Sequence, residues 1–62
     1  MTENEQLAKV FADIAKGCLE AANKWKAEIG TLKGADKMYS DLMADADRNA
    51  IKAKTLAPHL YS

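Results

Sequence analysis

The chain has 62 residues, a single cysteine, and nine basic and nine acidic residues, so its formal net charge is zero. A neutral chain has no general attraction to nucleic acid or to an anionic membrane, and one cysteine cannot form an internal disulfide. A chain of this length buries too little surface to be comfortably stable by itself, so we expect one domain, residues 1–62, that self-associates or binds a partner.

The sequence also bears on location. No apolar run approaches the roughly 18 residues that are needed to cross a bilayer, and the polar N-terminal residues lack the apolar core of a signal peptide. We therefore expect a cytoplasmic protein without membrane attachment, in which Cys18 is a reduced thiol.

The first predicted element is a long amphipathic helix over about residues 3–29. Thr2 and Glu5 have the spacing of a capping box, and Gly30 has the place of a left-handed helix stop. Gly17 costs about 1 kcal/mol relative to alanine inside a helix, and it either permits a close backbone approach or is a tolerated defect. The apolar stripe recurs every three or four positions and consists of Leu7, Val10, Phe11, Ile14, Cys18, Ala21, Trp25 and Ile29.

A turn and a second helix follow. Gly30 and Gly34 interrupt the helical pattern and predict a turn over about residues 30–34. A second helix is predicted over about residues 35–56, and Pro58 ends it because the residue before a proline disfavours the helical conformation. A short tail, residues 57–62, follows, and we expect that its segment from Pro58 to Ser62 cannot be helical at its start. The apolar face of the second helix consists of Ala35, Met38, Tyr39, Leu42, Ala46, Ala50, Ala53, Leu56 and Ala57.

Two long helices joined by a short turn predict an all-α fold, a two-helix antiparallel hairpin. Phe11 and Ile14 would then face the alanine-rich half of the second helix, while Trp25 and Ile29 would meet its bulkier first half near the turn. The first helix is also apolar beside its main stripe, at Ala8, Ala12, Ala15 and Leu19. Since so wide an apolar arc normally touches more than one neighbour, we expect two hairpins to pair into a homodimeric four-helix bundle.

The residue types that carry chemistry are sparse and scattered. Cys18 lies within the apolar stripe, as a small buried thiol does, and His59 has no serine or acid held near it. Asp41 and Asp45 share a helix face, but Asp47 projects elsewhere, which indicates a solvated acidic surface rather than a metal site. We expect no catalytic activity, no cofactor and no metal.

Binding residues are predicted in three groups. The surface for self-association or for a protein partner consists of Phe11, Ile14, Leu19, Trp25, Leu42 and Ile51. Four lysines gather around the predicted turn and are candidates for nucleic-acid contact: Lys24, Lys26, Lys33 and Lys37. In the tail, His59, Leu60 and Tyr61 either fold back over the open end of the bundle, which burial of apolar groups favours, or project as a motif for a partner.

The length and the hairpin layout resemble those of the plasmid copy-control protein Rop. This resemblance in helix arrangement implies a dimer of hairpins that binds paired RNA loops. No residue motif accompanies it, so no site is transferred. We predict instead a small regulator or inhibitor, of the kind that phages and plasmids encode, which binds a larger protein. The alternatives are a Rop-like RNA- or DNA-binding dimer that uses the four lysines, and a protein that holds a small ligand between its subunits.

Overall fold

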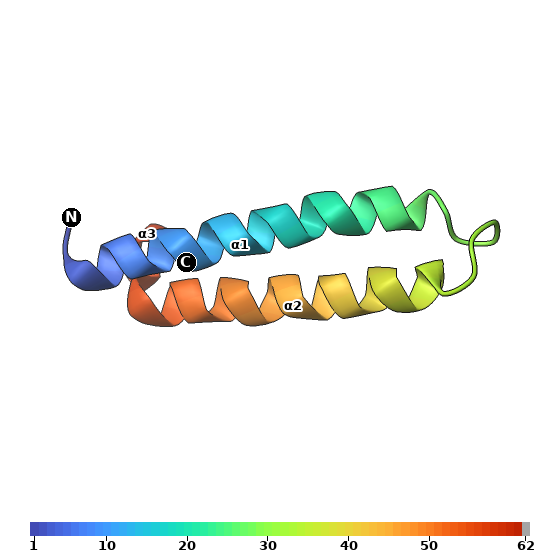
Figure 1. The fold of residues 1–62 in the computed structure, drawn as a ribbon. Helices are drawn as coiled ribbons and strands as arrows, with labels where there is room; N and C mark the ends of the chain where they lie inside the picture. Colours follow the sequence, from blue (N-terminus) through green and yellow to red (C-terminus); the bar gives the residue numbers. More distant parts are fainter. Residues whose placement is uncertain (62) are drawn as a thin grey trace.

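The computed structural model describes residues 1–61 and shows an α-helical hairpin (Figure 1). α1 spans Glu3–Lys26, α2 spans Ala35–Leu56, and a single-turn helix, α3, spans Pro58–Tyr61. α1 and α2 run side by side in opposite directions, and α3 folds back at the end of α2, where its His59 side chain reaches Glu5 near the start of α1. The molecule is a thin rod of 45 × 14 × 14 Å. The prediction of an all-α two-helix hairpin is confirmed.

The start of α1 is fixed by the capping box that the sequence predicts. The Glu5 N–H donates to Thr2 Oγ1 at 3.1 Å, and the Thr2 N–H donates to Glu5 Oε1 at 2.9 Å. Both bonds satisfy backbone donors that have no partner within the helix. Glu3 and Glu5 also place negative charge at the positive end of the helix dipole.

Replacing Thr2 by alanine should lower the free energy of unfolding by about 1 kcal/mol, because the hydroxyl that accepts the Glu5 N–H is lost. Urea unfolding followed by circular dichroism measures the change. Thr2→Ser keeps the hydroxyl and should stay within a few tenths of a kcal/mol of the unaltered protein. Equal losses in the two variants would show that the cap does not stabilise the hairpin.

The end of α1 differs from the prediction. The helix ends at Lys26 rather than near residue 29, so the turn covers residues 27–34 and Ile29 lies in it, 44% exposed. The Glu28 and Ile29 N–H groups donate to carbonyls three residues back, at 2.9 and 3.2 Å. This hydrogen-bond pattern is tighter than that of an α-helix, so the α-helix ends here. Gly30, with φ of +93°, then reverses its direction. The three- and four-residue spacing that ends at Ile29 therefore continues beyond the helix itself.

Alanines form the contact between α1 and α2, which we call the alanine seam. From α1 it takes Ala8, Ala15 and Ala22, at steps of seven residues, and from α2 it takes Ala35, Ala46 and Ala53, all at most 7% exposed. Within residues 1–61, no side chain as large as valine is fully buried. The small side chains let the two helices approach closely, which larger ones would prevent.

The predicted stripe of α1 therefore meets α2 only along one edge. Leu7, Val10 and Ile14 are 47%, 51% and 44% exposed, so the expectation that Ile14 faces the alanines of α2 is wrong. Phe11 does meet them, because it packs against the buried cluster of Ala8, Ala53 and Ala57. The seam runs along the edge of the stripe, and most of the bulky apolar surface of α1 stays uncovered.

The tail is helical from Pro58 onward, which corrects the expectation that the segment beginning at Pro58 cannot be helical at its start. Pro58 takes the first helical position, where a missing N–H costs nothing, and Ala57 before it is extended, with φ of −144°. The tail folds back as favoured: Tyr61 packs against the cluster of Ala8, Ala53 and Ala57. Leu60 stays 48% exposed, so one of the two large side chains covers the end of the hairpin.

Candidate binding surfaces

The first candidate surface lies along α1 beside the alanine seam, and we call it the Ile14 face. It comprises the exposed Leu7, Val10 and Ile14 and the half-buried Phe11, Cys18 and Trp25. These residues are spaced three, four and seven positions apart and therefore share one side of the helix. The ammonium of Lys52 lies 5.2 Å from the centre of the Phe11 ring, so α2 borders this face with a cation–π contact.

The second candidate surface lies on the other side of the seam, and we call it the Leu19 groove. It is a shallow groove of about 230 Å³ lined by Ala12, Ala15, Lys16, Leu19, Ala50, Ala53, Lys54 and Tyr61. Leu19 is 43% exposed and forms one apolar wall. Among the described residues neither Lys16 nor Lys54 forms an ion pair, so two positive charges border an apolar floor.

The six residues predicted for self-association or partner binding do not form one surface. The Ile14 face contains Phe11, Ile14 and Trp25, whereas Leu19 lies in the groove. Leu42 is half-buried on α2. Ile51, 61% exposed, is five residues from Ala46 and two from Ala53, which turns it away from the seam to the outer face of α2. The sequence pattern missed the groove residues of α2, Ala50 and Lys54, since only the pairing of the helices brings them to Leu19.

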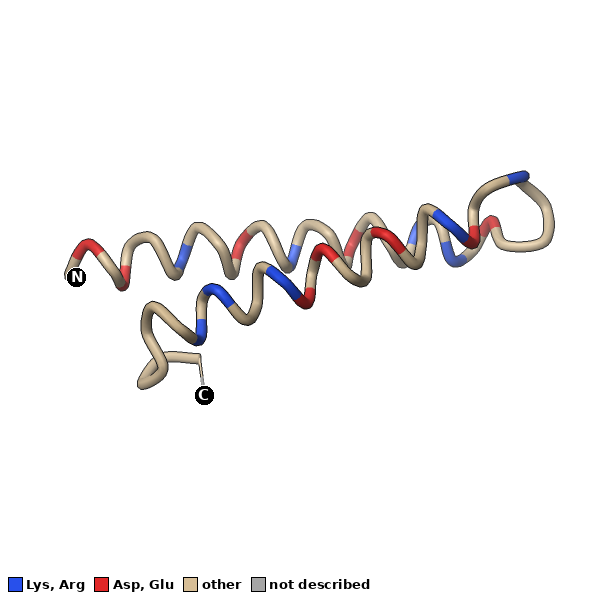
Figure 2. Tube along the Cα trace, turned by 90° about the horizontal axis from the view of Figure 1, so that it is seen from below, with Lys and Arg blue, Asp and Glu red and all other residues tan. Residues whose placement is uncertain are grey.

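The four lysines predicted for nucleic-acid contact all lie at the turn end of the rod and are exposed: Lys24, Lys26, Lys33 and Lys37. Acidic residues share that end. Glu28 and Asp36 lie in the same stretch, and Lys37 is 3.9 Å from the Asp41 carboxylate. Figure 2 shows both signs of charge along each helix and near the turn. Nucleic-acid binding stays a prediction, and the charges around the turn are mixed rather than uniformly basic.

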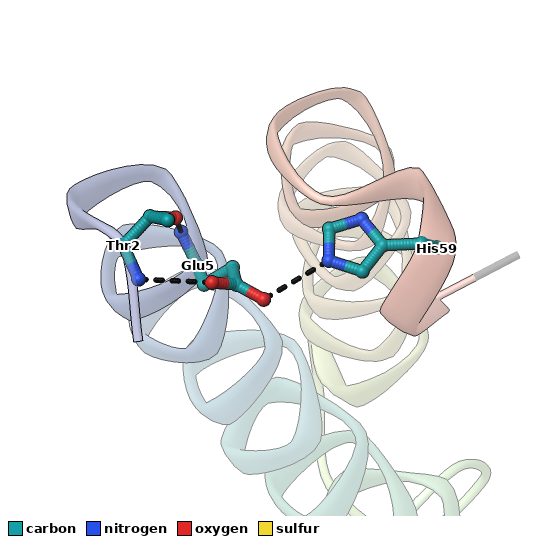
Figure 3. A network of polar contacts seen from close by, with 3 residues as sticks. All are labelled: Thr2, Glu5 and His59. Atoms are coloured by element: carbon teal, nitrogen blue, oxygen red, sulfur yellow. Dashed lines mark hydrogen bonds and ion pairs between the residues drawn. The ribbon is translucent and has the colours of Figure 1, made fainter.

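One polar contact joins the two ends of the chain (Figure 3). His59 of α3 donates from Nε2 to Glu5 Oε2 at 3.0 Å, while the other oxygen of the same carboxylate accepts the Thr2 N–H. The Thr2 backbone bond, followed by the His59 bond, lowers the pKa of Glu5 from 4.5 to about 2. Sequence reasoning missed this pair, because 54 positions separate the two residues and no periodic pattern relates them.

This lowered pKa makes stability depend on pH in a defined window. A carboxyl group whose pKa is lower in the folded chain stabilises the fold above its unfolded pKa, and that contribution disappears as the pH falls through the folded value. We therefore expect the stability advantage of the unaltered protein over Glu5→Gln to be full above about pH 4.5 and to vanish towards pH 2. Urea midpoints measured across this range by circular dichroism test it.

Glu20→Gln is the matched control for that experiment, because Glu20 is an exposed carboxylate of α1 that makes neither the Thr2 nor the His59 contact. Its difference from the unaltered protein should change less with pH. A Glu5→Gln variant whose stability follows the unaltered protein in parallel from pH 5 to pH 2 would contradict the assigned role of these hydrogen bonds.

Residues 1–61 contain no group of three or more His, Cys, Asp or Glu side chains placed to hold a metal ion, and no helix among them is both long and apolar enough to cross a membrane. Cys18 is half-buried rather than in the core.

Comparison of the chain with protein-family models, curated proteins and solved structures found no match. The Ile14 face and the Leu19 groove are two separate apolar surfaces on the described part of the chain.

Proposed function

We propose that this protein is a non-enzymatic protein-binding module. Two copies pair into a homodimeric four-helix bundle, and the bundle binds a larger protein in the cytoplasm as a regulator or inhibitor. One observation carries the proposal: alanines form the contact inside the hairpin, while Leu7, Val10, Ile14 and Leu19 stay 43–51% exposed. A helix of a self-sufficient domain buries its bulky apolar face, and uncovered apolar patches of this kind are typical of interaction surfaces.

The two surfaces suit two different occupants. The Ile14 face runs along most of α1, is bordered by α2, and offers the long apolar surface that a bundle of four helices requires. The Leu19 groove is shorter and holds positive charge beside an apolar floor. It fits a partner helix that presents one large apolar side chain flanked by acidic residues, since Lys16 and Lys54 are free to pair with them.

Light scattering and circular dichroism over a micromolar concentration range test the self-association. We expect the mass of two chains and high helicity. Ile14→Glu should shift the mass towards one chain, because it places a charge in the middle of the Ile14 face, whereas Ala44→Glu adds the same charge on the exposed outer face of α2 and should leave the dimer intact. A monomer at all concentrations with undiminished helicity would refute the bundle.

Partner binding is tested by measuring affinity for a partner that co-purifies under mild conditions. Leu19→Glu should abolish that affinity while the dimer mass is unchanged, because Leu19 forms a wall of the groove rather than part of the Ile14 face. Ile51→Glu, on the outer face of α2, tests whether the remaining predicted residue contributes. If the Leu19→Glu variant binds the partner as tightly as the Ala44→Glu variant does, the groove is excluded as the docking site.

A further inference from the structure

The Ile14 face is complementary to a second copy of itself in one orientation. We infer that α1 of one copy packs antiparallel on α1 of another, about a two-fold axis near Ile14, with Val10 of each copy seated over Gly17 of the other. This inference deepens the proposed self-association and rests on it. It names the surface, the occupant and the register, none of which a dimer mass alone would reveal.

Side-chain size is the first argument. The N-terminal half of the Ile14 face is bulky, whereas positions 17, 18 and 21 beyond Ile14 are small, and Trp25 lies past them at the end of α1. An antiparallel second copy sets large residues against small ones over residues 7–21, whereas a parallel copy sets large against large and small against small there. The facing pairs are Leu7 with the partner's Ala21, Val10 with the partner's Gly17, and Phe11 with the partner's Cys18.

Gly17 is the second argument. It lies inside α1, where glycine is disfavoured, and a Cβ built on it would meet nothing within 4 Å in the single hairpin. Neither the fold of one chain nor its turn requires a glycine there. Seven residues separate it from Val10, so the two occupy the same edge of the helix. In the antiparallel pair, the missing side chain gives the valine of the other copy a place to sit.

Charge is the third argument. Glu3 precedes Val10 by seven residues, and Lys24 follows Gly17 by seven residues, near the two ends of α1. Both charges therefore lie on the helix edge that carries Val10 and Gly17. Neither forms an ion pair among residues 1–61. The register that seats Val10 on Gly17 also brings Glu3 of each copy to Lys24 of the other, at both ends of the interface. Parallel packing would set like charges together.

The position of α2 is consistent with the same two-fold axis near Ile14. Because Lys52 lies over Phe11, and the helices run in opposite directions, the level of Ile14 corresponds to about Asn49 on α2. A two-fold axis at that level pairs α2 with the partner's α2 and brings Asp45 near the partner's Lys52. The same axis therefore brings a second pair of opposite charges together.

Charge reversal tests the contact within the intact protein. Glu3→Lys should raise the dimer dissociation constant about three- to tenfold, since two opposite-charge pairs become like-charge pairs. The double variant Glu3→Lys with Lys24→Glu should restore the dissociation constant. The two residues lie at opposite ends of α1 within one chain, so only an intermolecular contact can produce rescue. An additive loss in the double variant would overturn the register.

Disulfide trapping tests the orientation, in a Cys18→Ala background with one new cysteine per chain. Mixed and oxidised, the Val10→Cys and Gly17→Cys chains should form a covalent heterodimer, while each variant alone should not. In the inferred register identical residues at position 10 are seven residues apart along the axis, about 10 Å, which is beyond the reach of a disulfide. Gly17→Cys is accommodated by the hairpin, because open space surrounds that position.

The outcomes separate the two proposals. Trapping of the mixture together with a two-chain mass supports both. A two-chain mass with trapping only in the single variants indicates parallel packing, and a two-chain mass without any trapping indicates packing on another surface; either result overturns the inference and leaves the bundle standing. A one-chain mass overturns the bundle itself.

Discussion

Replacing Ala53 by leucine is expected to lower the free energy of unfolding by about 1–3 kcal/mol. Ala53 is 1% exposed and packs with Ala8 and Ala57 at the end of the hairpin where α3 folds back. A leucine has no space in this contact without moving α2 away from α1, and a domain of this size has only about 3–5 kcal/mol of stability to lose. Urea unfolding followed by circular dichroism should show the loss directly.

Ala44→Leu makes the same chemical change on the exposed side of the same helix. Alanine and leucine have similar helix propensities, so this control should change the free energy of unfolding by less than about 0.5 kcal/mol. If both variants lose stability equally, the close alanine contact between α1 and α2 does not exist in solution.

The second large effect is expected at Gly34, which precedes α2 with φ of +84°. Gly34→Ala should cost about 1–2 kcal/mol, because an L-residue is strained in this left-handed conformation. Steric conflict is not the cause, since an added Cβ would meet nothing within 4 Å. The carbonyl of Gly34 accepts the Met38 N–H at 3.0 Å, so a residue that forces this backbone to move also weakens the start of α2.

Gly34→Asn separates backbone strain from the mere presence of a side chain, because asparagine adopts the left-handed region several times more readily than most residues. In urea unfolding it should lose clearly less stability than Gly34→Ala. An alanine variant as stable as the unaltered protein would show that the turn does not need a positive φ at this position.

The local features of the fold could be predicted because each has a local cause. The hydroxyl of Thr2 and the carboxylate of Glu5 act within one turn of helix, and Gly30 and Gly34 supply the positive φ values of the turn. The bounds of α2 agree with the apolar spacing and with Pro58. In each case the residues that determine the structure are neighbours along the chain.

The choice of seam could not be predicted, because the apolar arc of α1 is wider than the contact that one neighbouring helix makes. The apolar spacing places both Ile14 and Ala15 within that arc, and we expected the larger residue, Ile14, to be buried against α2. The structure buries Ala15 to 7% exposure and leaves Ile14 at 44%. Close helix approach favours small residues at the contact, and periodicity carries no information on the distance between helices.

The candidate surfaces were predictable only in part for a similar reason. Leu19 lies within the wide apolar arc of α1, which the sequence shows, but its groove is completed by Lys54 and Tyr61, which reach it through the pairing of α2 and the fold of α3. The pair of Glu5 and His59 likewise depends on α3 returning to the start of α1. Contacts between distant parts of the chain follow from packing, which the sequence pattern describes only coarsely.

The thermal unfolding of a single hairpin whose helices meet through alanines should differ from that of an ordinary globular domain. Most of its leucine, isoleucine and valine side chains are already 43–61% exposed, so unfolding transfers less apolar surface to water than in a domain that buries such side chains. The heat-capacity change on unfolding should therefore fall below the roughly 12–15 cal/mol/K per residue of globular domains, and the thermal transition of the isolated hairpin should be broad. If two copies pair as proposed, calorimetry at rising concentration should show the transition sharpen and its heat-capacity change grow, because α1 of each copy then covers the apolar face of α1 in the other copy.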